Sequence, residues 1–169
     1  PLEGFSENVR GSIQEYAENS KSEVEKGNNF LQWVLTRVFE ATEDDAADAI
    51  VDGANDLGIY AYLPVDFSDN TIRLFQSKYG TSHSFEAIAK FKEDAKRLLG
   101  KDVTKMRPEL AHLVTKIKEK NLKMKCCYVT DQKVEYQDDL IEIIDIEKII
   151  QKLWERIKKP AAGKRSSIK

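Results

Sequence analysis

The hydrophobic positions along the chain predict an alternation of helices with short strands. Apolar residues recur every three to four positions over about residues 5–26, which predicts an amphipathic N-terminal helix. The Gly27-Asn28-Asn29 sequence breaks this pattern. Residues 30–41 then carry apolar side chains on nearly every side, as a helix buried on more than one face would. The acidic segment EDDAADAI that follows is expected to form a short helix or a loop.

Four segments are rich in the β-branched and aromatic residues that are typical of strands. The first two, IYAYLPV and TIRLFQSKY, are separated by a turn-forming sequence of Asp, Ser and Asn, and they predict a hairpin. KMKCCYVT and LIEII predict the third and fourth strands.

Three further helices are predicted from capping residues and apolar spacing. Ser84 is a favourable N-cap for a helix over residues 85–99, and Pro108 can begin another with apolar residues at helical spacing. Asp145 caps a last helix, which Pro160 ends. The predicted order is helix, helix, strand, strand, helix, helix, strand, strand, helix. This order indicates an α/β fold with a small mixed β-sheet between helical layers.

The composition indicates that this fold forms one globular domain. The chain has 169 residues, of which 41% are hydrophobic and 33% charged. We expect the domain to occupy residues 1–159, with a core from about residue 28, and residues 160–169 to form a basic linker or a disordered tail. No apolar run approaches the roughly 20 residues of a membrane helix. No secretory signal opens the chain either, so a cytoplasmic location without a membrane partner is expected.

The charge distribution is uneven and leaves open whether the protein binds nucleic acid. The formal net charge is −2. Residues 1–60 contain 4 Lys and Arg against 13 Asp and Glu, a balance of −9, whereas residues 61–169 contain 23 against 16, a balance of +7. The basic part could lie along a phosphate backbone or be an ordinary solvated surface.

The two cysteines are expected to be structural. Cys126 and Cys127 are adjacent in a predicted strand, so their side chains should lie on opposite faces of the sheet as buried, reduced thiols. A zinc site would require more ligands at wider spacing.

Candidate chemistry lies at the end of the second predicted strand. Alternate residues of a strand share a face, so Gln76 and Lys78 should emerge side by side beyond the apolar Ile72 and Leu74. A lysine placed there can orient a water molecule or stabilise a pentavalent phosphate, and a neighbouring oxygen can hold a divalent cation. The structural alternative is a polar strand end without chemistry.

At these residues the sequence resembles a known family. The run DGANDLGI, a strand, a turn and then IRLFQSKYG resemble the core of the Mrr-like branch of PD-(D/E)xK nucleases, and most of all the N-terminal domain of abortive-infection phage-resistance (AIPR) proteins. The resemblance spans roughly residues 28–150, although its specific part is the two strands. The helix upstream and the third predicted strand fit the same topology.

The resemblance implies a fold, a cofactor and partners. The fold is a restriction-endonuclease-like core, here with an extra N-terminal helix. The activity is Mg²⁺- or Mn²⁺-dependent hydrolysis of DNA, with RNA as an alternative substrate, in defence against phage. A homodimer is also a possible assembly for this chain, since nucleases of this fold that cut both DNA strands often work as dimers. The family architecture also implies that the remainder of a longer protein lies outside this chain.

Carried over residue by residue, the resemblance assigns a nearly complete site. Gln76 takes the position of the acidic residue of (D/E)xK and Lys78 that of its lysine. The metal-binding aspartate of the family falls on Tyr60, where a phenol with a pKa of about 10 is a poor ligand for Mg²⁺. Asp56, in a glycine-flanked turn, is the first candidate replacement, and Asp52 and Glu40, the latter on the preceding helix, are further candidates. The alternative for Asp52 and Asp56 is that their side chains only cap the backbone of a turn.

The residues leave three hypotheses open. The first is a metal-dependent DNA endonuclease in which Asp56 and Gln76 hold the ion and Lys78 positions the nucleophile. The second is a non-catalytic member of the same fold that binds nucleic acid or a protein, which Tyr60 favours. The third is an unrelated α/β interaction domain in which the match to the motif is accidental.

Overall fold

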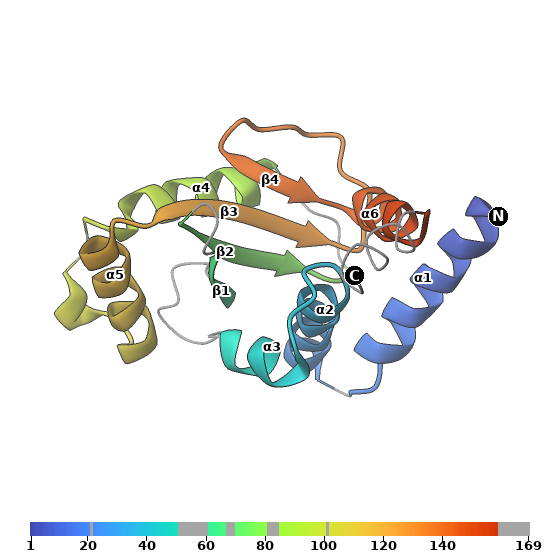
Figure 1. The fold of residues 1–169 in the computed structure, drawn as a ribbon, viewed down its shortest axis with the longest axis horizontal. Coiled ribbons are helices and arrows are strands. Elements are labelled where there is room, and N and C mark those ends of the chain that lie inside the picture. Colours follow the sequence, from blue (N-terminus) through green and yellow to red (C-terminus); the bar gives the residue numbers. More distant parts are fainter. Residues whose placement is uncertain (21, 51–60, 67–69, 81–84, 101, 159–169) are drawn as a thin grey trace, which may run out of the picture.

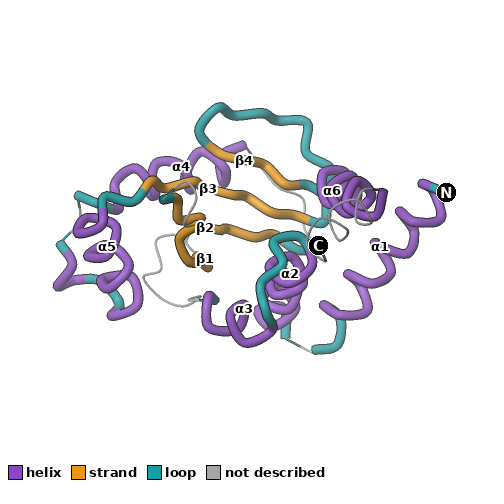
Figure 2. Tube along the Cα trace, in the orientation of Figure 1, coloured by secondary structure: helices purple, strands orange, loops and turns teal. Residues whose placement is uncertain are grey.

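The structure, a computed structural model, describes residues 1–20, 22–50, 61–66, 70–80, 85–100 and 102–158. It is an α/β domain whose strands lie between two groups of helices (Figures 1 and 2). In chain order its elements are α1 (Leu2–Ala17), α2 (Glu23–Arg37), α3 (Glu43–Ala49), β1 (Ala61–Asp66), β2 (Thr71–Lys78), α4 (Phe85–Leu98), the 3₁₀ helix η1 (Val103–Lys105), α5 (Pro108–Lys120), β3 (Lys123–Thr130), β4 (Ile141–Ile144) and α6 (Ile146–Lys158).

The four described strands form one mixed sheet in the order β1-β2-β3-β4. β1 and β2 are antiparallel, as the predicted hairpin requires, whereas β3 runs parallel to β2 and β4 runs parallel to β3. Parallel neighbours need a connection that returns the chain to the starting edge, usually through a helix. α4 and α5 make that return between β2 and β3, whereas the return from β3 to β4 is a loop. The carboxyl ends of β2, β3 and β4 therefore lie side by side at the same end of the sheet, which we call its carboxyl edge (Figure 1).

Helices cover both faces of this sheet, and alternate strand residues divide between two cores. On one face, Phe75 and Cys127 pack with buried residues of α1, α2, α3 and α6. On the other, Leu74 and Cys126 pack with buried residues of α4 and α5. The structure thus confirms the α/β class with a small mixed sheet between helical layers. It also confirms that the adjacent cysteines are buried on opposite faces.

The N-terminal helices differ from the sequence prediction in their boundaries. α1 ends at Ala17 rather than near residue 26, and α2 begins at Glu23 and runs through Gly27-Asn28-Asn29. The Ser22 side chain accepts a hydrogen bond from the Glu25 backbone N–H at 3.4 Å and so caps this early start. The unfavourable helix propensity of glycine and asparagine is outweighed because the following turns are buried in the core.

Two further helices follow the predicted capping residues, whereas the predicted cap Ser84 and the predicted stop Pro160 lie outside the described residues. α5 begins at Pro108 and ends at Lys120, and its C-cap Asn121 takes the left-handed conformation at φ 51°. Oδ1 of Asp145 accepts the Lys148 backbone N–H at 2.9 Å and starts α6 as predicted. The acidic segment after residue 42 is a helix, because the Thr42 side chain accepts the Asp45 backbone N–H at 3.0 Å. Within the described ranges, no helix is both long enough and apolar enough to span a bilayer.

Candidate functional site

Gln76 and Lys78 lie at the carboxyl end of β2, next to the parallel strand β3. In the register of the two strands, Gln76 is opposite Tyr128 and Lys78 is opposite Thr130. Alternation from Leu74 places both side chains toward the α4 and α5 side of the sheet. The strand and the side-by-side placement on it therefore agree with the sequence analysis, whereas a catalytic role for either residue stays a prediction.

The two side chains differ in their access to solvent. Gln76 is only 9% exposed and borders the fully buried Tyr128. Lys78 is partly exposed, two residues further along β2. A phosphate that approaches this end of the strand can therefore reach the ammonium group more readily than the Gln76 amide. The greater exposure of Lys78 is compatible with direct contact between its ammonium group and a phosphate.

Three of the acids and phenols discussed above fall outside the described residues. These are Asp52, Asp56 and Tyr60, so their predicted positions next to Gln76 and Lys78 remain predictions. Among the residues that the structure does describe, no three His, Cys, Asp or Glu side chains come together as a metal-binding group. A metal site at the end of β2 therefore depends on the segment that precedes β1.

Glu40 occupies a different part of the molecule from Gln76. It follows α2 with a φ of 61°, and its neighbours Phe39 and Ala41 pack on the α1 and α2 side of the sheet. Its Oε1 lies 3.5 Å from Nε of Arg156 on α6, and the Glu40 side chain is 70% exposed. In the structure Glu40 therefore joins the segment after α2 to α6 through an ion pair, and its role as a metal ligand stays a prediction.

Arg156 makes that ion pair part of a helix cap. Its Nη1 donates to the Arg37 carbonyl at 2.6 Å and its Nη2 to the Val38 carbonyl at 2.8 Å. These carbonyls end α2, where the backbone lacks helical partners and a cation is favoured. The guanidinium group thus fastens the end of α2 to α6, an interaction between residues far apart in the sequence.

A polar hollow lies at the carboxyl edge of the sheet, where open α/β sheets commonly bind ligands. It has a volume of about 480 Å³ and is lined by α1, by the ends of β2 and β3 and by the start of α6. Asp131 is one of its lining residues, and its Oδ1 accepts the Gly80 backbone N–H at 2.8 Å. Tyr79 donates to Glu18 Oε1 at 3.1 Å. The hollow opens beside Tyr79, which points to the opposite face from Lys78, so the two form separate features of one edge.

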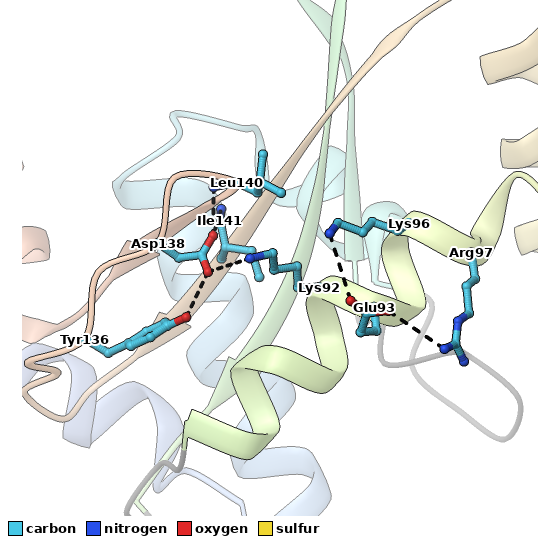
Figure 3. Close-up of polar contacts among 8 residues, drawn as sticks. All are labelled: Lys92, Glu93, Lys96, Arg97, Tyr136, Asp138, Leu140 and Ile141. Atoms are coloured by element: carbon cyan, nitrogen blue, oxygen red, sulfur yellow. Dashed lines mark hydrogen bonds and ion pairs between the residues drawn. The ribbon is translucent and has the colours of Figure 1, made fainter.

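A shielded ion pair anchors the loop that returns the chain from β3 to β4 (Figure 3). Lys92 Nζ on α4 lies 2.9 Å from Asp138 Oδ2, and only 5% of the Asp138 side chain is exposed. The same carboxylate accepts the Tyr136 hydroxyl at 2.8 Å and the Leu140 backbone N–H at 2.7 Å. Lys92 foremost, and then the Leu140 N–H, hold the pKa of Asp138 far below its usual range. The Asp138 carboxylate in turn raises the pKa of Lys92.

The sequence analysis did not identify this ion pair or the Arg156 cap. Neither Lys92 nor Asp138 stands out locally, because each is one charge among many along the chain. The one feature that could have indicated such an ion pair is that two parallel strands need a connection that returns the chain, and this connection must be held in place. That need becomes visible only when the strand directions are known.

The chain matches no protein-family model, no curated protein and no solved structure. The fold and the described site therefore define the class as an α/β domain with a small mixed four-stranded sheet flanked by helices.

Proposed function

We propose that this chain is a restriction-endonuclease-like nuclease domain, similar to the N-terminal domain of AIPR proteins, that hydrolyses DNA in defence against phage. The observation that carries the proposal is the placement of Gln76 and Lys78. They lie on one face at the carboxyl end of β2, which pairs with β1 on one side and with the parallel β3 on the other. This is the arrangement that the resemblance implies for the motif.

The described residues supply part of the chemistry. In this proposal the Lys78 ammonium holds the attacking water or stabilises negative charge on the phosphate as it forms. The Gln76 amide offers one oxygen, which is short of the full oxygen coordination that Mg²⁺ takes. The proposal therefore requires the Asp56 carboxylate as a further ligand. When bound, the divalent cation supplies Lewis acidity and lowers the pKa of a bound water.

A catalytically inactive domain of the same fold is the second candidate. It is favoured by Tyr60 in the position of the family aspartate and by the shielding of Gln76 from solvent. In this form the domain binds nucleic acid, or a protein, without cleaving it. It predicts that the unmodified chain binds but does not cut DNA, and that Tyr60→Asp gains affinity for Mg²⁺ in calorimetry.

Nicking of supercoiled plasmid tests the first candidate against the second. The chain is expected to nick plasmid in Mg²⁺ or Mn²⁺ and not in EDTA. Lys78→Ala is expected to lower the rate by about 10²- to 10³-fold, as removal of one group that stabilises transition-state charge typically does. Lys90→Ala is the matched control, because Lys90 is exposed on α4 and its ion pair among the described residues is with Asp94 one turn away. Equal rates for the Lys78 and Lys90 variants, or no cleavage by the unmodified chain, would rule the nuclease proposal out.

A further inference from the structure

One face of the sheet is only half covered by the described helices, and its open half carries basic side chains. On the α1, α2 and α6 side, Phe75 and Cys127 are fully buried. Two residues earlier in the same strands, Arg73 is partly exposed and the Lys125 side chain is 48% exposed. Figure 1 shows α2 and α6 near the carboxyl ends of the strands, and α4 and α5 belong to the core of the other face.

Four cations gather on this open half, which we call the basic strand face. Arg73 and Lys125 are register partners on β2 and β3, so their backbones are about 4.8 Å apart. Lys123 lies two residues before Lys125 on the same side of β3, roughly 6.6 Å along the strand. Lys152 approaches from α6. The strand geometry therefore holds these charges in a cluster.

Arg73 is positioned as a rigid donor within this face. Its guanidinium carbon lies 5.8 Å from the centroid of the Phe39 ring, which itself packs edge-on against Phe75 at 5.0 Å. Its Nε is shielded from solvent and has no hydrogen-bond partner among the described residues. An arginine stacked on an aromatic ring has its planar fork oriented in advance, which suits the paired oxygens of a phosphate.

The charge of the face is only partly neutralised. Glu142 lies among the cations, with Oε1 3.7 Å from Lys125 Nζ and Oε2 3.8 Å from Lys152 Nζ. Both distances exceed those of a direct charge-assisted hydrogen bond. Lys123 is exposed and makes no ion pair with any residue the structure describes. Asp138 and Asp139 line the same hollow as Lys123 and Lys125, and Asp138 is neutralised by Lys92. Four cations against the carboxylates of Glu142 and Asp139 leave an excess of positive charge on a surface that none of the described helices covers.

We propose that the basic strand face binds the phosphodiester backbone of DNA. The choice of DNA rests on the proposed nuclease function, and the face itself rests on the clustered cations and the stacked arginine. It lies on the opposite side of the sheet from Gln76 and Lys78, toward the amino ends of the strands. It is therefore a second contact that retains DNA on the domain and takes no part in the chemistry. Its contribution to affinity comes from released counterions, so it weakens steeply as salt increases.

Fluorescence anisotropy with a short labelled DNA duplex in EDTA tests this assignment without cleavage. The variant Lys123→Gln/Lys125→Gln removes two charges from the exposed part of the face. Each lost phosphate contact lowers the slope of log K against log salt by about 0.9, which is roughly eightfold in affinity at about 0.1 M salt. The variant should therefore bind roughly 60-fold more weakly, with a slope smaller by about 1.8. The control Lys90→Gln/Lys96→Gln removes the same charge from α4 and should retain the affinity of the unmodified chain.

The outcomes separate this proposal from the nuclease proposal. Equal affinity for both double variants, or no DNA binding by the unmodified chain, overturns the basic strand face. If polyglutamate competes as effectively as unlabelled DNA, the face binds an acidic protein and the proposal of a DNA-binding face is overturned. A preference for duplex RNA overturns the choice of DNA. Loss of binding in Lys123→Gln/Lys125→Gln supports the face even where plasmid is never nicked. Nicking that depends on Lys78, together with unchanged DNA affinity in Lys123→Gln/Lys125→Gln, supports the nuclease and overturns the face.

Discussion

The Lys92 ammonium lies 2.9 Å from Oδ2 of Asp138 and joins α4 to the loop that returns the chain from β3 to β4. This loop has no helix of its own, so its path depends on side-chain contacts. Asp138 supplies several of them, because one carboxylate accepts from Lys92, Tyr136 and the Leu140 backbone. The position of β4 in the sheet therefore depends in part on the ion pair between Asp138 and Lys92 of α4.

Replacement of Asp138 is expected to destabilise the fold in a pH-dependent way. Asp138→Ala removes the acceptor of two backbone N–H groups and lowers the free energy of unfolding by roughly 2 kcal/mol or more. The pKa of Asp138 is depressed in the folded state, so its contribution is complete above the unfolded pKa of about 3.9. It is lost as the pH falls below that value toward the folded pKa. Thermal unfolding from pH 7 to pH 2.5 should show the variant and the unmodified chain converging at acid pH.

The Lys92 side of the pair has the opposite pH dependence. The pKa of Lys92 is raised in the folded state, so its contribution is complete below the unfolded pKa of about 10.4 and is lost as the pH rises through the folded pKa. Lys92→Met should therefore lower the melting temperature at pH 7 and have a smaller effect above pH of about 11. Lys90→Met, at an exposed position on the same helix, should change little at either pH. A pH-independent effect of Lys92→Met would contradict an electrostatic role.

The two cysteines are expected to be unreactive in the folded protein. Burial raises the pKa of Cys126 to about 11 and raises that of Cys127 still further, with Glu142 as a second cause for the latter. Thiolate is the reactive form, so little of it is present at pH 8. Iodoacetamide should alkylate neither thiol on the timescale on which it modifies the urea-unfolded chain, as followed by mass spectrometry. Rapid modification of the folded protein would show that the strand β3 opens.

Two glycines should respond in opposite ways to the same substitution. Gly27 lies inside α2, where an added Cβ would meet no atom within 4 Å, so Gly27→Ala should stabilise the protein by about 0.5–1 kcal/mol. Gly80 has a φ of 74°, which other residues rarely adopt, so Gly80→Ala should destabilise it. Urea unfolding of both variants measures the difference. Destabilisation by Gly27→Ala would indicate that α2 does not begin at Glu23.

Arg156 and Glu40 should contribute unequally to the free energy of unfolding, although they form one ion pair. Arg156→Ala removes two hydrogen bonds to the carbonyls of Arg37 and Val38, each worth about 1 kcal/mol. Glu40→Gln removes only a surface ion pair, worth about 0–1 kcal/mol. Urea unfolding should rank the variants in this order. Loss of plasmid nicking in Glu40→Gln without loss of stability would instead support the predicted metal-ligand role of Glu40.

The sequence predicted those parts of the fold whose signals are local. The strand Lys123–Thr130 and the caps at Pro108 and Asp145 agree with the structure because each depends on neighbouring residues alone. The start of α2 did not follow from local propensity, because burial of its later turns outweighs Gly27 and its neighbours. Helix boundaries are where tertiary packing most easily overrides propensity.

The candidate site was predictable only as a motif on one strand. Alternation correctly paired Gln76 with Lys78, because a period of two residues is fixed by strand geometry. The ion-pair partners of Glu40 and Asp138 could not be predicted, since each of these partners lies more than 40 residues away along the chain. The grouping of Arg73 with Lys125 required the parallel register of β2 and β3.

A crystal structure of the chain in Mn²⁺, with the ion located by its anomalous scattering, tests the nuclease proposal most directly. An ion is expected at the carboxyl end of β2, bound by the Asp56 carboxylate and the Gln76 amide oxygen with Lys78 beside it. The same experiment on Asp56→Asn should show the site empty. An ion bound elsewhere, or no ion near Gln76 at saturating Mn²⁺, would contradict metal-dependent catalysis at this strand end.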